Sequence, residues 1–186
     1  MKVYVYYFDE MWQREVAYPM SCFNKDVVTI AREDRVYVSY ENMRLLPDMT
    51  VSEVNPEDVD LLIIPGGDEA VICQDEDLKK LVLSLNERGK YIAGICGGAM
   101  AMARFGILDG KRATGGGSGL DLETEEDKEV YRNVKVVPEG VVVDGNCITS
   151  TARAAFEFTV ELNDVMGLYK DDQEKKEDYD WLKYVK

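Results

Sequence analysis

Residues 91–100 read YIAGICGGAM, an apolar run that ends at Cys96 and is followed at once by small residues. A short apolar run before a glycine pair predicts a buried strand that turns sharply into a helix. A nucleophile on such a strained turn needs small neighbours, and Gly94, Gly97 and Gly98 supply them. We therefore expect a strand over 91–95, a helix over 99–105, and Cys96 at the turn between them.

A second apolar run, residues 59–65, reads VDLLIIP and ends in Gly66 and Gly67. Continuous apolar runs are typical of strands buried on both faces of a parallel sheet. A strand that ends in two glycines can turn its backbone N–H groups toward a neighbouring nucleophile, as in an oxyanion hole. An ordinary glycine turn explains the same residues equally well at this stage.

Strands and helices alternate along the rest of the chain, which predicts a doubly wound α/β fold. Its sheet would be mostly parallel, with helices on both faces and small β-hairpin additions. Ligands bind such sheets at the carboxyl ends of the strands, where Gly66 and Cys96 should lie. Further strands are expected at 2–8, 27–30, 36–40, 134–137, 141–143 and 147–149, and further helices at 15–23, 78–85 and 158–169.

The length of 186 residues favours one domain with an appended segment. We place the α/β domain at residues 1–169. Residues 170–186 are strongly charged with interspersed aromatic residues, and they fit either a docked helix or a frayed tail.

The chain carries 36 acidic and 22 basic side chains, a net charge of -14. Such a surface repels nucleic-acid phosphates and anionic membranes, so neither is an expected partner. No apolar stretch is long enough to cross a bilayer, and the first residues do not read as a signal peptide. We therefore expect a cytoplasmic protein.

The chain contains no histidine, which excludes Cys-His and Ser-His-Asp triads within it. Its four cysteines, Cys22, Cys73, Cys96 and Cys147, are too scattered for a disulfide scaffold or a metal site. The glycine-rich segment 114–119 lacks nucleotide-binding spacing, and we read it as a flexible loop rather than an anion-binding nest. We expect no cofactor and no metal.

The position of Cys96 at a helix N-terminus predicts a lowered thiol pKa and an enriched thiolate. The alternative is a buried, unreactive cysteine at the end of a strand. The other three cysteines are interpreted as small core residues, and Arg153 as a surface charge.

These segments together resemble the ThiJ/PfpI superfamily, relatives of the class I glutamine amidotransferases and of the parkinsonism-associated protein deglycase. The resemblance covers roughly residues 1–169, and the strand 61–67 and the turn at Cys96 are its most specific parts. The matching stretches are FDEMWQREVAYP at 8–19, LLIIPGG at 61–67, AGICGGAM at 93–100, GILDGKRATG at 106–115 and DGNCITSTARAAFEF at 144–158.

The resemblance implies a flavodoxin-like fold, a homodimer, and Cys96 as the nucleophile. It also implies a glutamate from the first helix, for which Glu15 is the best match and Asp9 and Glu10 are competitors. Oxyanion amides would come from the glycines Gly66, Gly67 and Gly97.

The sequence departs from the family at both positions where members carry a histidine. Protease-like members have it directly after the cysteine, where this chain has Gly97. Other members take it from the region that reads KRATG here, residues 111–115. Peptidase or amidotransferase activity of a lone chain is therefore in doubt.

Three functions remain open from the sequence. The first is a glyoxalase or deglycase acting on small 2-oxoaldehydes through a Cys96 hemithioacetal, with Glu15 as acid and base. The second is a non-catalytic redox- or stress-responsive protein that senses an oxidant through Cys96. The third is a residual amidase- or peptidase-type hydrolase without the histidine. The partner is a small-molecule substrate in the first and an oxidant in the second.

Overall fold

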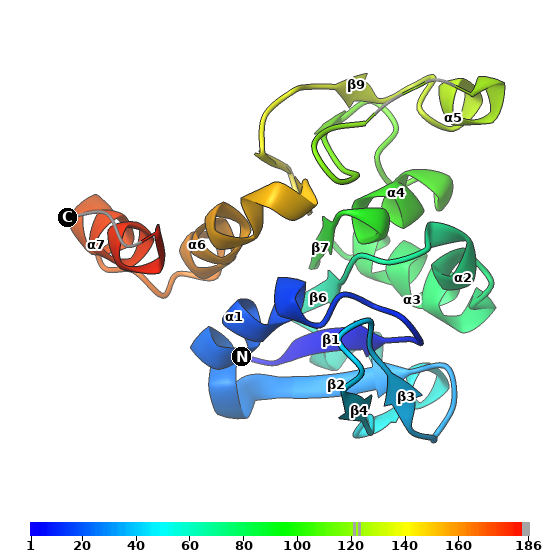
Figure 1. The fold of residues 1–186 in the computed structure, drawn as a ribbon, viewed down its shortest axis with the longest axis horizontal. Coiled ribbons are helices and arrows are strands. Elements are labelled where there is room, and N and C mark those ends of the chain that lie inside the picture. The colour runs from blue at the N-terminus through cyan, green and yellow to red at the C-terminus, as the bar shows by residue number, and fades with distance from the viewer. Residues whose placement is uncertain (121, 123, 184–186) are drawn as a thin grey trace.

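A computed structural model describes residues 1–120, 122 and 124–183, and its centre is a seven-stranded sheet in the order β10-β11-β7-β6-β1-β2-β5 (Figure 1). All neighbouring strands pair in parallel except β10, which is antiparallel to β11. The strands are β1 (Val3–Tyr7), β2 (Val27–Ala31), β5 (Met49–Thr50), β6 (Leu61–Ile64), β7 (Tyr91–Ile95), β10 (Val141–Asp144) and β11 (Cys147–Ser150).

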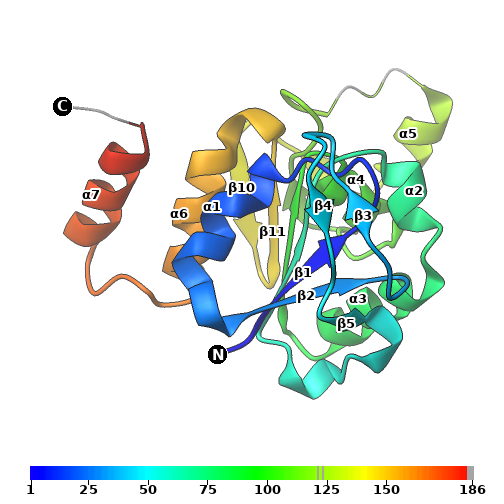
Figure 2. The same cartoon turned by 60° about the horizontal axis from the view of Figure 1, so that its bottom comes forward.

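Helices cover both faces of the sheet (Figure 2). On one face lie α1 (Arg14–Phe23) and α6 (Ala155–Val165), and on the other lie α3 (Glu76–Glu87) and α4 (Gly97–Arg104). Two short helices, α2 (Glu69–Cys73) and α5 (Glu125–Val130), complete this second side. The sequence-based prediction of a doubly wound, flavodoxin-like α/β fold is confirmed.

The sheet is buried on both faces at its centre, which explains the apolar runs in the sequence. Every residue of β1 and β6 is buried, as are all but the first residue of β7. Removal of this apolar surface from water is the main force that holds the layers together.

Two small sheets lie outside the central one. β3 (Tyr37–Val38) and β4 (Arg44–Leu45) form an antiparallel hairpin, which confirms the strand expected at 36–40 and a small β-hairpin addition to the sheet. β8 (Arg112–Ala113) pairs in parallel with β9 (Lys135–Val136), so the strand expected at 134–137 lies outside the main sheet. Short 3₁₀ turns are formed by Asn24–Asp26, Val51–Glu53, Pro56–Asp58 and Ala152–Ala154.

The last helix of the domain differs from its predicted bounds of 158–169. It begins three residues earlier, at Ala155, and ends at Val165. Gly167 follows with a φ of 72°, a left-handed conformation that suits glycine and stops the helix.

Strand β1 lies between β2 and β6, and this arrangement positions the site. The chain leaves β1 toward β2 on one side, whereas β6 and β7 continue on the other. The carboxyl ends of β1, β6 and β7 are therefore neighbours at the point where the strand order reverses, which is where ligands bind in such sheets. Residues 8–15, the Gly66–Gly67 turn and Cys96 all belong to this edge.

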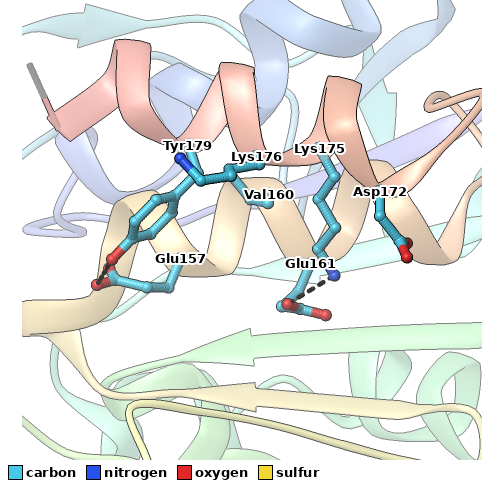
Figure 3. Close-up of a pocket in the computed structure, with 7 residues that line it drawn as sticks. All are labelled: Glu157, Val160, Glu161, Asp172, Lys175, Lys176 and Tyr179. Carbon is cyan, nitrogen blue, oxygen red and sulfur yellow. Dashed lines mark hydrogen bonds and ion pairs between the residues drawn. The ribbon is translucent and has the colours of Figure 1, made fainter. Parts of the chain in front are cut away.

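A final helix, α7 (Asp172–Lys183), packs on the outside of α6 (Figure 1). None of its side chains is buried, and Trp181 is 75% exposed. Figure 3 shows Lys175 paired with Glu161 and Tyr179 donating to Glu157. These residues line a hollow of about 290 Å³ between the two helices. The contacts between α6 and α7 in this hollow are therefore largely polar.

Removal of residues 170–186 is expected to lower the free energy of unfolding by less than about 2 kcal/mol. Exposed ion pairs contribute about 0–1 kcal/mol each, and α7 adds little apolar burial. Urea titration of the truncated and full chains measures the difference. A loss above about 4 kcal/mol would instead make α7 part of the domain core.

Candidate functional site

Cys96 lies on a strained turn between β7 and α4. Its φ of 55° and ψ of −122° are unusual for a residue with a side chain. Surrounding hydrogen bonds hold this conformation: the Cys96 N–H donates to Ser150 O at 2.9 Å, and the Gly116 N–H donates to Cys96 O at 3.3 Å. A non-glycine residue kept in such a conformation often marks a functional site.

The glycine after the cysteine is required by close backbone contact. A Cβ on Gly97 would lie 2.1 Å from the carbonyl oxygen of Gly67. The turn after β6 therefore packs directly against the turn at Cys96. No side chain fits at position 97 without movement of the backbone, and this applies to a histidine as much as to an alanine.

Gly97→Ala is expected to destabilise the protein by about 3 kcal/mol or more, because the new methyl group overlaps a carbonyl oxygen that cannot turn aside. Gly117→Ala is the matched control, since a Cβ there meets nothing within 4 Å. That control should change stability by less than about 1 kcal/mol. Thermal and urea unfolding compare the two, and equal stabilities would contradict the close contact at Gly97.

Glu15 stands in the first turn of α1 and reaches the same turn after β6. Its side chain is only 1% exposed, and its Oε2 accepts the Gly66 N–H at 2.8 Å. A Cβ on Gly66 would lie 2.3 Å from Glu15 Oε2 and 3.1 Å from Cys96 Sγ. The carboxyl group and the sulfur therefore lie beside the same face of Gly66.

The two competing acidic residues lie elsewhere. Asp9 accepts hydrogen bonds from the Arg35 guanidinium at 2.6 Å and from the Val38 N–H at 3.0 Å. Glu10 is exposed on the loop before α1. Of the three acids considered from the sequence, Glu15 is the one that shares the Gly66 contact with Cys96.

The expected set of oxyanion amides changes in one respect. The Gly66 N–H is already engaged by Glu15 and is not directed to the nucleophile. The backbone amides of Gly97 and Gly67 instead act on Cys96, and each lowers the pKa of its thiol. The sequence pattern did not distinguish the two glycines of the Gly66–Gly67 pair.

The electrostatics of the sulfur contradict the expected low thiol pKa. Burial raises the pKa of Cys96, and the negative charge of Glu15 raises it further, so the amides of Gly97 and Gly67 are outweighed. Burial also raises the pKa of Glu15 to about 7, against the opposing effects of the Gly66 amide and Arg14. The two acids therefore compete: ionisation of one opposes ionisation of the other.

The glycine-rich segment 114–119 is packed against the turn at Cys96 rather than arranged as a nest. The Gly116 N–H donates a hydrogen bond to Cys96 O. The carbonyl oxygens of Gly116 and Gly117 accept hydrogen bonds from the N–H groups of Ala152 and Arg153, respectively. The Arg153 side chain is exposed, as expected.

The remaining cysteines are only partly the core residues that we expected. Cys147 is buried, Cys73 is half-buried, and Cys22 is exposed near the end of α1. Within the described range, no cluster of three Cys, Asp or Glu side chains is arranged to hold a metal ion. No helix among those residues has the length and hydrophobicity needed to span a membrane.

Sequence reasoning missed one residue at this edge, Glu41 in the β3–β4 hairpin. Its carboxylate accepts the N–H groups of Gln13 and Arg14, directly before Glu15. No local pattern could identify it, because 27 residues separate it from Arg14.

Comparison with known proteins gives a consistent set of relatives. The family model described as the DJ-1/PfpI family matches residues 1–164. A protein named deglycase from Pyrococcus horikoshii is 31% identical over 108 residues. The matched region covers 58% of this chain and 61% of the relative, which is less than two thirds of either. The protein named Deglycase PfpI from Pyrococcus furiosus is 27% identical over 154 residues, 81% of this chain and 89% of that one.

A solved structure of a thiJ/pfpI family protein from Bacillus anthracis is also similar. It superimposes with a TM-score of 0.86 at 26% identity, over 100% of this chain and 91% of that one. The likeness therefore extends over the whole α/β architecture.

Proposed function

Because the chain belongs to the DJ-1/PfpI family, we propose that it is a cysteine-dependent enzyme of the glyoxalase or deglycase type, acting on small reactive carbonyls. One observation carries the proposal: a buried carboxyl with a pKa of about 7, Glu15, lies beside the same glycine as the Cys96 sulfur. A general acid–base group is most effective when its pKa lies near the working pH. Two relatives that are named deglycases support the reaction class.

The first step is addition of the thiol to the aldehyde carbon of a 2-oxoaldehyde. The Glu15 carboxylate takes the thiol proton as the S–C bond forms, and the carbonyl electron pair moves to oxygen. Glu15 then gives this proton to the new alkoxide oxygen, which completes the hydroxyl group and restores the carboxylate. The product of this step is a hemithioacetal on Cys96.

The later steps need no external oxidant. Glu15 carries a proton from the former aldehyde carbon to the adjacent keto carbon. The hydroxyl proton of the hemithioacetal passes to the former keto oxygen, and the product is a thioester. Water then cleaves the thioester to a 2-hydroxy acid and regenerates the thiol. The aldehyde carbon is oxidised and the keto carbon reduced, so the sum is addition of one water molecule.

The two alternative functions receive less support from this geometry. A hydrolase of the protease-like type needs a histidine, and Gly97 leaves no room for one. A peroxide sensor relies on a resting thiolate, whereas burial and Glu15 raise the pKa of the Cys96 thiol. Addition to a carbonyl with Glu15 as base does not require a resting thiolate.

The test is direct incubation of the purified chain with methylglyoxal, with lactate measured by chromatography. Catalytic formation of lactate above the spontaneous rate is the expected result. A chain that is folded by circular dichroism but yields no lactate, and no repair of a glycated cysteine or arginine derivative, would overturn the proposal.

The homodimer and the cytoplasmic location remain predictions.

A further inference from the structure

Helix α1, which carries Glu15, begins without a cap of its own. Gln13 at the N-cap position has helical backbone angles and no capping side-chain hydrogen bond. The first amides of a helix have no acceptor within the helix. Here the N–H groups of Gln13 and Arg14 donate to the two carboxylate oxygens of Glu41, at 3.1 and 3.2 Å.

Glu41 is held in place because the β3–β4 hairpin is fastened to the segment before α1. The Tyr40 N–H donates to Met11 O at 2.9 Å, and the Glu10 N–H donates to Val38 O at 2.8 Å. The rings of Trp12 and Tyr40 also pack against each other at an angle of 33°, with centroids 3.7 Å apart. The hairpin and the start of α1 therefore form one packed unit.

The same unit contacts the turn that carries the site. The Trp12 N–H donates to Gly66 O at 2.9 Å, while the Gly66 N–H donates to Glu15. We propose that Glu41 is a positioning residue: its carboxylate fixes the N-terminus of α1 and thereby sets both the placement and the protonation of Glu15 beside Cys96. This inference rests on the proposed function of Glu15 as acid and base.

The charges around Glu15 agree with this role. Burial has the largest effect and raises the pKa of Glu15; Arg14 lowers it, and Glu41 raises it. The Cys96 sulfur is the other titrating group at the site. For Glu41 itself, burial raises the pKa, but hydrogen bonds from its own backbone and the Arg14 and Gln13 amides outweigh that effect, so the carboxylate is ionised at neutral pH.

The experiment measures the titration of Glu15 directly, by carbon-13 NMR of labelled glutamate carboxyl groups without substrate. The resonance is assigned by its loss in Glu15→Gln. In Glu41→Gln the midpoint of Glu15 is expected to move to lower pH, because a neighbouring negative charge is lost. Glu33→Gln removes an equal charge from the exposed segment between β2 and β3 and should leave the midpoint unchanged.

A second variant separates charge from geometry. Glu41→Asp keeps the charge, but its shorter side chain cannot reach both amides. Hydrogen exchange at Gln13 and Arg14 should then accelerate about fivefold, as expected for a lost cap, while the Glu15 midpoint stays closer to that of the wild type than in Glu41→Gln.

The inference is overturned if the Glu15 midpoint is the same in Glu41→Gln and Glu33→Gln, or if amide exchange is unchanged in Glu41→Asp. Neither readout uses turnover. A wild-type protein that is inactive on methylglyoxal would overturn the proposed function, yet these titrations would still decide whether Glu41 controls Glu15.

Discussion

Cys96→Ser is expected to reduce the turnover of methylglyoxal by about 10³-fold or more. A serine hydroxyl has nearly the same size as the thiol, so the strained turn and its hydrogen bonds to Ser150 and Gly116 should remain. The hydroxyl is far less acidic and far less nucleophilic, and Glu15 with a pKa of about 7 is too weak a base to activate it. The loss therefore reflects chemistry rather than folding.

The measurement compares lactate formation by the variant and by two matched controls, Cys22→Ser and Cys73→Ser. Both controls replace a free cysteine that is not fully buried, and both should retain wild-type rates. Circular dichroism and urea unfolding confirm that the variants are folded. Undiminished turnover in Cys96→Ser would exclude a covalent intermediate on this residue, and a similar loss in either control would show that the effect is not specific to Cys96.

Glu15→Gln is expected to lower turnover by about 10²–10⁴-fold, the usual contribution of a positioned general acid–base group. The glutamine oxygen can still accept the Gly66 N–H, so the shape of the site is kept. In the wild type, the rate should rise with pH through about 7, as Glu15 becomes the carboxylate that accepts the thiol proton. The variant should lose this step in its pH profile.

The same substitution has the opposite effect on stability. The folded-state pKa of Glu15 is about 7, raised above the ordinary value of 4.5. The folded protein therefore holds this proton more tightly than the unfolded chain, and stability from this group is full below pH 4.5 and is lost as pH rises through 7. Glu15→Gln removes the buried charge and should stabilise the protein at pH 8 by up to about 3 kcal/mol relative to the wild type.

Urea unfolding at pH 5 and pH 8 tests this result, with Glu10→Gln as the exposed control. The difference in stability between Glu15→Gln and the wild type should increase from pH 5 to pH 8, whereas the control should show no such change. A pH-independent difference would mean that Glu15 is ionised in the folded protein at both values. A variant that is more stable but inactive is the pattern expected when a buried charge is kept for function.

The sequence by itself determined the order of the main strands and helices, because those signals are local. An apolar run such as residues 91–95, followed by small residues, predicts a buried strand that turns at Cys96. Missed elements such as β4, β5, α2 and α5 are too short to show a periodicity. The choice of Glu15 over Asp9 and Glu10 came from the family resemblance, and the geometry agrees with it.

Tertiary structure alone decided the chemistry of the site. The sequence placed Cys96 at a helix N-terminus and so predicted a low thiol pKa, but burial and the nearby Glu15 reverse that direction. The sequence also could not show that the Gly66 N–H donates to Glu15 or that Gly97 contacts the Gly67 carbonyl. Nor could it show that Glu41 caps α1. Protonation and positioning depend on which groups meet in space after the strands pair, and segments distant in the chain supply those groups.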